Sequence, residues 1–423
     1  MDEKYSALFT PWKIGDVEIP NRIVQCSMGG TSLFGWLEPC HFDKEASYFL
    51  LNRAKDGVGL VLPGMQCVRD TMGIPGRKWL YQNDKMFKDL AEYMPEYHRT
   101  GGKLFIQLAA GFGRSMAVNG WMTKLAKNDI LNKLASPVID VQYSCASASA
   151  TPNRWAEDLT SRPMTVEEIQ EQVDAFGKTA KKLRDAGVDG VEIHAVHEGY
   201  LLDQFTMKNW NSRTDQYGGS FENRYRFPVE IVQSIKAQAG SDFPVSLRYS
   251  VVSKTKAWGK GAMPYETDFV EFGRDMEESE KAVKYLGDAG YDMFNSDNGT
   301  YDAWYWAHPP QYMPDNCNLE YIEHIKAFTD KPVVCAGRMD PVKAAEEIAA
   351  GRLDGVAIAR QNLVDPEWVT KIKEGRQDDI KPCIRCHNGC FNFAKFKGTP
   401  NIQNTNDSLH LARCALNPTT MQH

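Results

Sequence analysis

The 423-residue sequence contains no long apolar run and no surplus of positive charge. No stretch approaches the roughly 20 consecutive apolar residues that a membrane-spanning helix needs. Asp and Glu outnumber Lys and Arg by 55 to 49, and this balance argues against a nucleic-acid binder with a broad basic surface. Residues 1–12 carry acidic side chains where a secretory signal would have a basic and then an apolar stretch. We therefore expect a cytoplasmic protein that binds neither membranes nor nucleic acid.

Short β-rich apolar runs alternate with longer segments of helical period along most of the chain. The expected strands are Arg22–Met28, Val58–Gly64, Lys103–Leu108, Gly190–His194, Val245–Tyr249, Met293–Ser296, Val333–Ala336 and Gly355–Ala359. The expected helices lie near 43–55, 84–100, 165–186, 221–239, 268–289, 318–329, 341–350 and 366–374. Eight such units predict an α/β fold of the (β/α)₈ TIM-barrel type. A doubly wound open sheet is the competing arrangement, but it usually has a G-x-G-x-x-G turn after its first strand, and none follows Met28.

Three segments stand outside this alternation. Trp12–Ile23 predicts an N-terminal hairpin around Gly15 that closes the barrel floor. Residues 109–164 follow the third strand without steady periodicity, and a second long loop, 251–267, follows the fifth. Because such loops emerge at the C-terminal face of a barrel, where barrel enzymes carry out their chemistry, we expect them to be functional.

The ten cysteines are distributed unevenly. In an intracellular chain they argue against a disulfide framework and for metal or redox use. The scattered six, which we expect to be small buried side chains, are Cys26, Cys40, Cys67, Cys145, Cys317 and Cys335. The other four, Cys383, Cys386, Cys390 and Cys414, form C-x₂-C-x₃-C with a distant fourth member. Four thiolates of this kind can hold a [4Fe–4S] cluster or a zinc ion.

A long composite motif covers the fourth strand and the segment after it. His194 and His197 form H-x-x-H, G-Y-L-L-x-Q-F begins at Gly199, and N-x-R-T-D-x-Y-G-G-S-x-E-N-R covers Asn211–Arg224. In these residues the sequence resembles the Old Yellow Enzyme family of FMN-dependent ene-reductases, and the likeness extends over nearly the whole chain. Glu198 adds one residue before Gly199, a spacing closer to the bacterial 2,4-dienoyl-CoA reductase branch.

His194, His197 and Tyr200 are the candidate catalytic residues. The two histidines end a strand, where imidazole N–H groups can donate to a carbonyl or nitro oxygen and stabilise a developing enolate. The Tyr200 phenol can donate a proton to the carbon left after hydride addition. The matching family residues have these roles. The alternative is that a histidine is only a satisfied core residue, or that the tyrosine only packs.

Residues at other strand ends are candidates for binding FMN. Gln107 offers a donor and an acceptor to the pyrimidine edge of an isoalloxazine. The resemblance implies that Arg248 lies near flavin N1, where a cation stabilises the reduced flavin. Gly337 to Arg338 and Ala359 to Arg360 follow the last two strands, where barrels commonly bind phosphate. The full expected set is Ser27, Met28, Gly64, Gln107, Arg248, Gly337, Arg338, Ala359 and Arg360.

The resemblance favours iron–sulfur over zinc at the four C-terminal cysteines. In trimethylamine dehydrogenase, 2,4-dienoyl-CoA reductase and the bile-acid-inducible ene-reductases, the same feature follows the FMN barrel and relays single electrons to FMN. We therefore expect an FMN barrel over 1–375 and a [4Fe–4S] segment over 376–423, with an insertion around Thr399–Ser408. Because the chain has no dinucleotide fingerprint, we expect no FAD- or NAD(P)-binding domain in it. Electrons then come ultimately from NAD(P)H through a donor flavoprotein or a missing domain.

These features predict an ene-reductase that acts on a small enone or enoyl substrate, such as a 3-oxo steroid, a bile acid, a flavonoid or an enoyl-CoA. An amine dehydrogenase of the trimethylamine dehydrogenase type and an electron-transfer subunit are the alternatives. The aromatic segment Tyr301–His308 either walls a flat apolar substrate or packs under the cysteine tail. The sequence leaves both a monomer and a homo-oligomer as alternatives.

Overall fold

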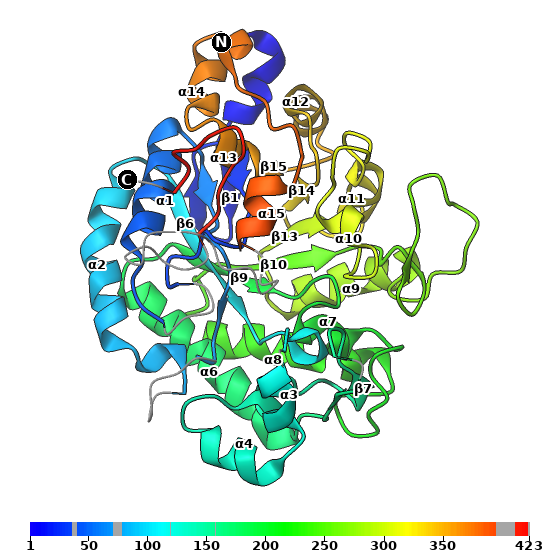
Figure 1. Ribbon diagram of the computed structural model, residues 1–423. Helices are drawn as coiled ribbons and strands as arrows, with labels where there is room; N and C mark the ends of the chain where they lie inside the picture. The colour runs from blue at the N-terminus through cyan, green and yellow to red at the C-terminus, as the bar shows by residue number, and fades with distance from the viewer. Residues whose placement is uncertain (36–39, 71–77, 119, 157, 395–410, 422–423) are drawn as a thin grey trace.

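The computed structural model describes residues 1–35, 40–70, 78–118, 120–156, 158–394 and 411–421. Within them, eight parallel strands close into a barrel that a ring of helices surrounds (Figure 1). In order round the barrel the strands are β3 (Ile23–Gln25), β4 (Leu60–Val61), β6 (Lys103–Ala109), β9 (Gly190–His194), β10 (Val245–Ser250), β13 (Met293–Asp297), β14 (Val333–Ala336) and β15 (Gly355–Ile358). Parallel pairing of β15 with β3 closes the ring. The predicted (β/α)₈ fold is confirmed, although β3 and β4 are shorter than expected.

The outer helices follow the strands in the expected alternation. They are α1 (Lys44–Asp56), α2 (Asp84–His98), α6 (Val166–Asp185), α8 (Phe221–Ala239), α9 (Met276–Ala289), α11 (Leu319–Lys326), α12 (Pro341–Ala349) and α14 (Trp368–Lys373). Helix α6 illustrates why these segments form helices. Thr165 and Glu168 form a capping box at its start, and the apolar face of Ile169, Val173 and Phe176 is buried.

One helix begins later than the periodicity predicts. The expected helix near 268–289 starts only at Met276, with Asp275 as its N-cap. The preceding residues bond to the loop after β10 instead, since the amide of Phe272 donates to the Thr255 carbonyl at 2.8 Å and the amide of Arg274 donates to Ser253 Oγ at 2.7 Å. Contact between the two segments therefore overrides the helical pattern.

The predicted hairpin closes the floor of the barrel. Its strands β1 (Trp12–Ile14) and β2 (Val17–Ile19) pair antiparallel. Trp12, Ile14 and Ile19 pack in the same cluster as the inward-facing side chains of the barrel strands. The hairpin thus covers the N-terminal end of the barrel interior.

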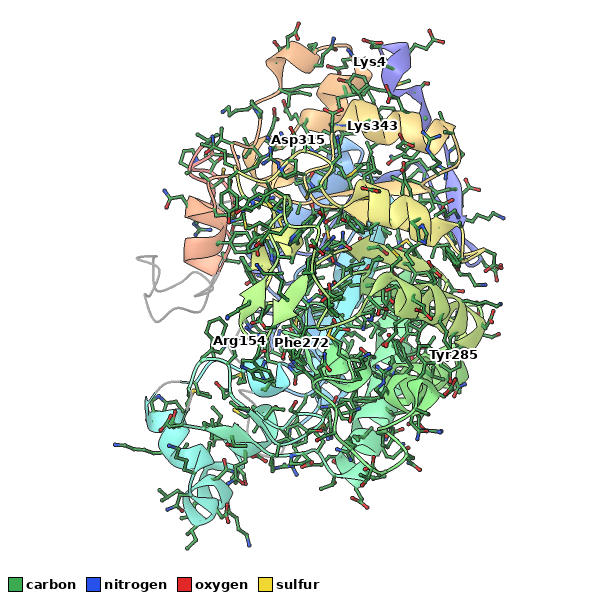
Figure 2. All side chains as sticks on the ribbon, turned by 90° about the vertical axis from the view of Figure 1, so that its right-hand side faces the viewer. Lys4, Arg154, Phe272, Tyr285, Asp315 and Lys343 are labelled. Carbon is green, nitrogen blue, oxygen red and sulfur yellow. The ribbon has the colours of Figure 1, made fainter. Side chains whose placement is uncertain are left out.

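Residues 111–159, which we call the projecting loop, contain local structure that the sequence pattern did not predict. They hold the short helices α3 (Gly120–Ala126), α4 (Asp129–Ala135) and α5 (Val141–Ser144), with the turn η3 (Gly113–Ser115) before them. Figures 1 and 2 show α3 and α4 standing out from the barrel. A small apolar cluster joins α3 to α5, and Asn132 of α4 hydrogen-bonds to Asp140 and to the amide of Val141. These helices have at most seven residues, too few for a period to stand out.

The C-terminal segment returns to the mouth of the barrel. It contains α13 (Gln361–Val364), η4 (Gln377–Asp379) and α15 (Asn388–Ala394). Beyond the expected insertion around Thr399–Ser408, which lies outside the described residues, the amide of Ala412 donates to the Gly30 carbonyl at 2.9 Å. No helix in the described part of the chain combines the length and the apolar character needed to cross a bilayer.

Candidate active site at the mouth of the barrel

A cavity of about 1100 Å³ lies at the C-terminal ends of the barrel strands. The expected residues that line it are Ser27, Met28, Gln107, His194, His197, Tyr200, Arg248, Gly337, Arg338, Ala359, Arg360, Cys383 and Cys390. The described structure does not put Gly64, Cys386 or Cys414 on its wall. One cavity thus collects the expected catalytic residues, most of the expected flavin set and part of the cysteine segment.

Gly64 lies behind the wall. A Cβ atom there would come within 2.5 Å of the Met28 carbonyl oxygen and 2.8 Å of the Ser32 nitrogen, so a larger residue does not fit. Its amide donates to Thr31 Oγ1 at 3.0 Å. Gly64 therefore supports the backbone beneath Met28.

A buried hydrogen-bond chain crosses the mouth below the cavity. Ser27 Oγ donates to Gln107 Oε1 at 2.8 Å, and Gln107 Nε2 donates to Glu192 at 2.6 Å. Glu192 also accepts from Ser246 Oγ and Asn295 Nδ2, both at 3.0 Å. The Gln107 amide keeps one further donor and one further acceptor site. Glu192 was missed from the sequence, although a carboxylate inside the apolar strand β9 was the available signal.

Arg248 and His197 share one carboxylate. Arg248 donates to Asn295 Oδ1 at 2.8 Å and also to Asp297. The other Asp297 oxygen accepts from His197 Nε2 at 2.8 Å. Asp297, which is fully buried, was not among the expected site residues. It fixes the His197 ring and balances the buried Arg248 charge.

His194 and Tyr200 form a close pair. Their ring centroids are 3.8 Å apart in an edge arrangement. Burial, with a smaller contribution from His197, lowers the pKa of His194 well below its ordinary value, so its ring is neutral. Its buried Nδ1 atom has no hydrogen-bond partner among the described residues. A ligand oxygen or nitrogen in the cavity can satisfy that atom.

The hydroxyl of Tyr200 interacts with that of Tyr301. Burial raises the pKa of Tyr200 well above its ordinary value, and the neighbouring Tyr301 adds to the effect. Burial raises the pKa of Tyr301 to about 12. The amide of Tyr301 donates to the His197 carbonyl at 2.8 Å, and its ring lies so close to Gly199 that a Cβ there would clash. Both phenols are therefore protonated and held in place.

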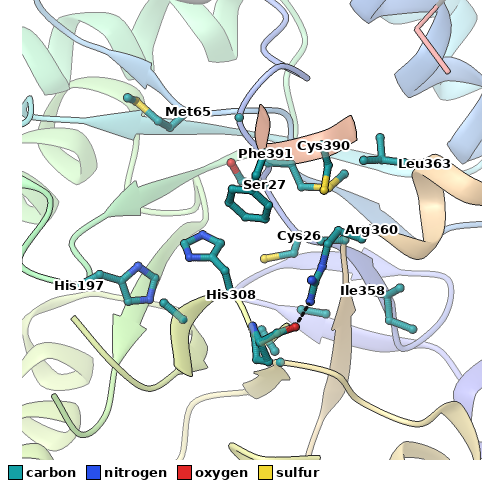
Figure 3. A pocket seen from close by; sticks show the side chains of 18 of the residues that line it. Cys26, Ser27, Met65, His197, His308, Ile358, Arg360, Leu363, Cys390 and Phe391 are labelled. Atoms are coloured by element: carbon teal, nitrogen blue, oxygen red, sulfur yellow. Dashed lines mark hydrogen bonds between the residues drawn. The ribbon is translucent and has the colours of Figure 1, made fainter. Parts of the chain in front are cut away.

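The segment Tyr301–His308 combines both roles considered for it. Tyr301, Trp304 and His308 line the cavity. The Trp304 and His308 rings also contact Phe391 of the cysteine segment, at centroid distances of 5.8 and 5.0 Å. Figure 3 shows the His308 ring between those of His197 and Phe391. Burial lowers the pKa of His308 well below its ordinary value.

Glu198 joins the projecting loop to the strand-four loop. It is fully buried, and its carboxylate accepts from Arg114 Nη1 at 2.5 Å and also from Arg154. Arg154 additionally pairs with Asp302. Figure 2 shows Arg154 where the projecting loop meets the barrel. His197 and Glu198 both have left-handed backbone, with φ of 66° and 54°, an uncommon conformation for residues other than glycine.

At the opposite end of the cavity, arginines bond to nearby chain segments. Arg338 donates to the carbonyls of Pro310 and Gln311, each at 2.8 Å, and pairs with Asp315. Arg360, labelled in Figure 3, donates to the Pro309 carbonyl at 2.9 Å. It also contacts His387. Burial lowers the pKa of Arg360. Two fixed cations thus stand beside the ends of β14 and β15, where a phosphate group would need them.

The four C-terminal cysteines come to one region without forming a closed metal centre. In the described residues, no three potential ligand side chains lie close enough to hold a metal ion. Cys383 and Cys390 line the cavity, and a Cβ on Gly389 would meet Cys414 Cα at 2.8 Å. Burial raises the pKa of Cys390 to about 11, whereas Arg360 acts in the opposite direction. Four thiols are a donor set that fits a thiolate-bound metal or cluster.

The other cysteines are mostly buried, as expected. Cys26, Cys40, Cys67, Cys145 and Cys335 are buried, whereas Cys317 is only partly so. Burial raises the pKa of Cys26 to about 11.

The cavity also fits a flavin. It is large enough for a cofactor of that size, Gln107 and Arg248 lie on its floor, and His194 and His308 each present a buried nitrogen without a partner in the described structure. A hydrogen-bonding ring system with a phosphate tail matches this distribution of groups.

Comparison with known proteins also points to a flavin-dependent enzyme family. Residues 7–379 match the family model described as the NADH:flavin oxidoreductase / NADH oxidase family. The chain is 42% identical over 403 residues to cinnamate reductase of Clostridium sporogenes, which covers 93% of this chain and 57% of that protein. It is 31% identical over 413 residues to NADH oxidase of Thermoanaerobacter brockii, with 97% and 56% covered. The chain thus spans little more than half the length of these relatives.

The fold is also found among solved structures. A 2-naphthoyl-CoA reductase in complex with 2-naphthoyl-CoA superposes with a TM-score of 0.76 at 24% identity, covering 99% of this chain and 58% of that one. At that identity the likeness supports the fold alone. The family match covers most of the chain and includes every strand of the barrel. This chain therefore belongs to the NADH:flavin oxidoreductase / NADH oxidase family.

Proposed function

We propose that this chain is an FMN- and [4Fe–4S]-dependent oxidoreductase that reduces a carbon–carbon double bond conjugated to a carbonyl group. One observation carries the proposal: His194, His197 and Tyr200 line the same cavity as Gln107 and Arg248. Hydrogen-bond donors for a carbonyl, a proton donor and a flavin-binding floor are then within reach of one substrate.

In this proposal FMN supplies the hydride for the β-carbon. Ser27, Met28, Gln107 and Arg248 bind the flavin ring, and Gly64 supports them through Met28. Gly337, Arg338, Ala359 and Arg360 line the same cavity and would hold the phosphate group. At Gly337 the backbone φ is +115° and a Cβ would meet Asn318 at 2.3 Å, so the chain requires glycine there.

The histidines bind and polarise the substrate carbonyl. His194 is neutral, and its unpartnered nitrogen needs an acceptor or donor from the ligand. His197 is held by Asp297 and cannot rotate freely. Donors fixed in advance cost no reorganisation when enolate charge develops on the carbonyl oxygen.

Tyr200 donates the proton to the α-carbon. Its raised pKa means that the phenol keeps its proton until a strongly basic carbon forms beside it. The interaction with Tyr301 orients the hydroxyl. Both rings line the cavity, so each hydroxyl can meet a ligand bound there.

The cluster part of the proposal depends on Cys383, Cys386, Cys390 and Cys414. A [4Fe–4S] cluster bound there supplies electrons one at a time. Phe391 and His308 lie in contact between this segment and the histidine side of the cavity. Electrons originate from NAD(P)H through a donor flavoprotein or through a region beyond this chain.

Anaerobic purification followed by cofactor analysis and a substrate panel tests the proposal. We expect non-covalent FMN, about four irons with acid-labile sulfide per chain, and reduction of enones or enoates with reduced viologen as donor. Zinc without iron would refute the cluster. Oxidation of secondary or tertiary amines, with no enone reduced, would favour the amine dehydrogenase alternative.

The electron donor is tested separately. Dithionite or viologen should reduce the flavin of this chain rapidly, and NADH or NADPH should do so only slowly. Rapid stoichiometric flavin reduction by NADH would contradict the expected need for another donor.

A further inference from the structure

Beyond Tyr200 the cavity continues beneath the projecting loop, where its wall is apolar. The residues of this lobe are Met65, Phe112, Met116, Val118, Trp121, Met122, Ile139 and Trp155. Of the described side chains that the projecting loop contributes to the cavity, none is charged. Trp121 and Trp155 are half exposed, so they stand at the rim between the lobe and solvent. A wall of this composition accepts an uncharged aromatic group and opposes a charged one.

One polar side chain interrupts this apolar wall. Ser115 lines the cavity and is 3% exposed, and its Oγ has no hydrogen-bond partner within the described residues. Buried hydroxyl groups are normally paired, so this one calls for a partner from a ligand or a water molecule.

The position of Ser115 follows from its turn. The Phe112 ring lies 5.3 Å from the Tyr200 ring, and the amide of Ser115 donates to the Phe112 carbonyl at 3.0 Å. Three residues of such a 3₁₀ turn advance by about 6 Å. Ser115 is therefore separated by about that distance along the turn from Phe112, whose ring packs on Tyr200.

The turn that carries Ser115 is fixed from several sides. Gln204 Oε1 accepts from the amide of Arg114 at 3.1 Å, and Glu198 binds the Arg114 guanidinium. Trp155 Nε1 donates to the Ser115 carbonyl at 2.8 Å. The residue that departs from the common family spacing, Glu198, thus helps to hold this serine. A fixed hydroxyl discriminates between ligands better than a mobile one.

We propose that this lobe is a subsite for an aromatic ring that carries a hydroxyl group on the side remote from the double bond, with Ser115 as the partner of that hydroxyl. The substrate class is then a hydroxyaryl α,β-unsaturated acid or ketone. This inference rests on the proposed ene-reduction and names its substrate more narrowly.

Two matched ligand pairs test the subsite. The first pair, cinnamate and 4-hydroxycinnamate, is compared by kcat/KM with reduced viologen as donor. The second pair, 3-phenylpropanoate and 3-(4-hydroxyphenyl)propanoate, is compared by Kd from tryptophan fluorescence, which needs no turnover. We expect wild-type protein to prefer the hydroxylated member of each pair by about tenfold, the contribution of one well-placed hydrogen bond.

The Ser115→Ala variant should lose this preference and keep its affinity for the unsubstituted ligands. Ser136→Ala is the matched control, because Ser136 lies partly exposed on the same loop, outside the cavity wall, and its Oγ donates to the Lys133 carbonyl at 2.9 Å. An equal response to both members of each pair in wild-type protein, or an unchanged preference in Ser115→Ala, would overturn the subsite. A binding preference that Ser115→Ala removes, without reduction of any unsaturated compound, would uphold the subsite and refute the proposed function.

Discussion

The floor of the cavity and the lobe under the projecting loop are built in opposite ways. The floor is a chain of buried ionic and amide groups that runs from Gln107 through Glu192 and Asn295 to Arg248 and Asp297. The lobe is made of methionine, phenylalanine, valine, isoleucine and tryptophan side chains with a single hydroxyl. Fixed charges suit a cofactor whose charge changes during the reaction, whereas an apolar lobe suits the inert part of a substrate.

The two regions also differ in what holds them. Floor residues project from strands whose register is set by closure of the barrel. The projecting loop has its own small core and is tied to the barrel by Glu198. Conserving the floor while changing the loop would therefore change the substrate and keep the chemistry. The following predictions probe this division.

The largest effect on the free energy of unfolding is expected for Glu198, which joins the projecting loop to the barrel. Glu198→Ala leaves Arg114 and Arg154 as buried cations without their shared carboxylate, which should cost about 3–5 kcal/mol of unfolding free energy. Urea unfolding measures it, with Glu198→Gln as a milder variant if the alanine variant does not fold. Asp158→Ala removes a surface pair with Lys127 on the same loop and should be neutral. Equal stability of wild type and both Glu198 variants would show that the loop is held by other contacts.

Tyr200→Phe should impair the chemical step and spare binding. The ring still packs against His194, but the proton donor is lost, so reoxidation of the reduced flavin by an enone should slow by about 10²-fold or more. Stopped-flow absorbance across substrate concentrations separates rate from affinity. Tyr285→Phe, which changes a tyrosine packed against Phe221 outside the cavity, serves as the control. A wild-type rate in Tyr200→Phe would move the proton donor to Tyr301 or water.

The histidines around the cavity predict a loss of stability in acid. The pKa values of His194 and His308 are lowered in the folded state, so both rings are neutral there and take up a proton more readily when unfolded. Their contribution is complete above the unfolded pKa of about 6.5 and falls by up to about 1.4 kcal/mol per histidine for each pH unit below it. Unfolding free energies at pH 7.5, 6.5 and 5.5 measure this slope. His308→Gln cannot gain the charge and should flatten it, and an unchanged slope would contradict the neutral ring.

The smallest effect is expected at the tip of the projecting loop. Leu134 is 73% exposed on α4, so Leu134→Ser should change the unfolding free energy by no more than about 0.5 kcal/mol. Leu104→Ser, at a fully buried position of β6, should be strongly destabilising. Thermal melts of the two variants compare the regions directly. A large loss in Leu134→Ser would show that something covers α4.

The sequence predicts both the barrel and the clustering of residues at its strand ends, because both follow from closure of the sheet. Apolar runs at strand spacing imply closure, and closure brings the ends of distant strands to one mouth. His194, Gln107 and Arg248 could therefore be expected in one site without knowledge of their contacts. The partner Asp297 could not, because an acidic residue after a strand is common and only pairing of β10 with β13 brings it to Arg248.

Contacts between loops account for the remaining differences between the sequence-based predictions and the structure. The start of α9 is set by hydrogen bonds to the loop after β10. Gly64 does not line the cavity, because the backbone of Met28 lies directly against it. Glu198 stood out in the sequence only as an extra residue, whereas its partners Arg114 and Arg154 are more than forty positions distant. Such pairings leave no period in the sequence.

The shared carboxylate of Asp297 has a thermodynamic consequence. One of its oxygens serves the arginine on the cofactor side, and the other serves the histidine on the substrate side. Negative charge that develops near Arg248 competes with Asp297 for the guanidinium group. This competition changes the strength of the hydrogen bond between Asp297 and His197. By linkage, a ligand that binds more tightly after the cofactor gains electrons must make the cofactor easier to reduce by the same factor. Under the proposed function, a substrate that binds the reduced protein more tightly should raise the redox potential of the flavin, and we expect this coupling to run through Asp297 because it contacts both Arg248 and His197.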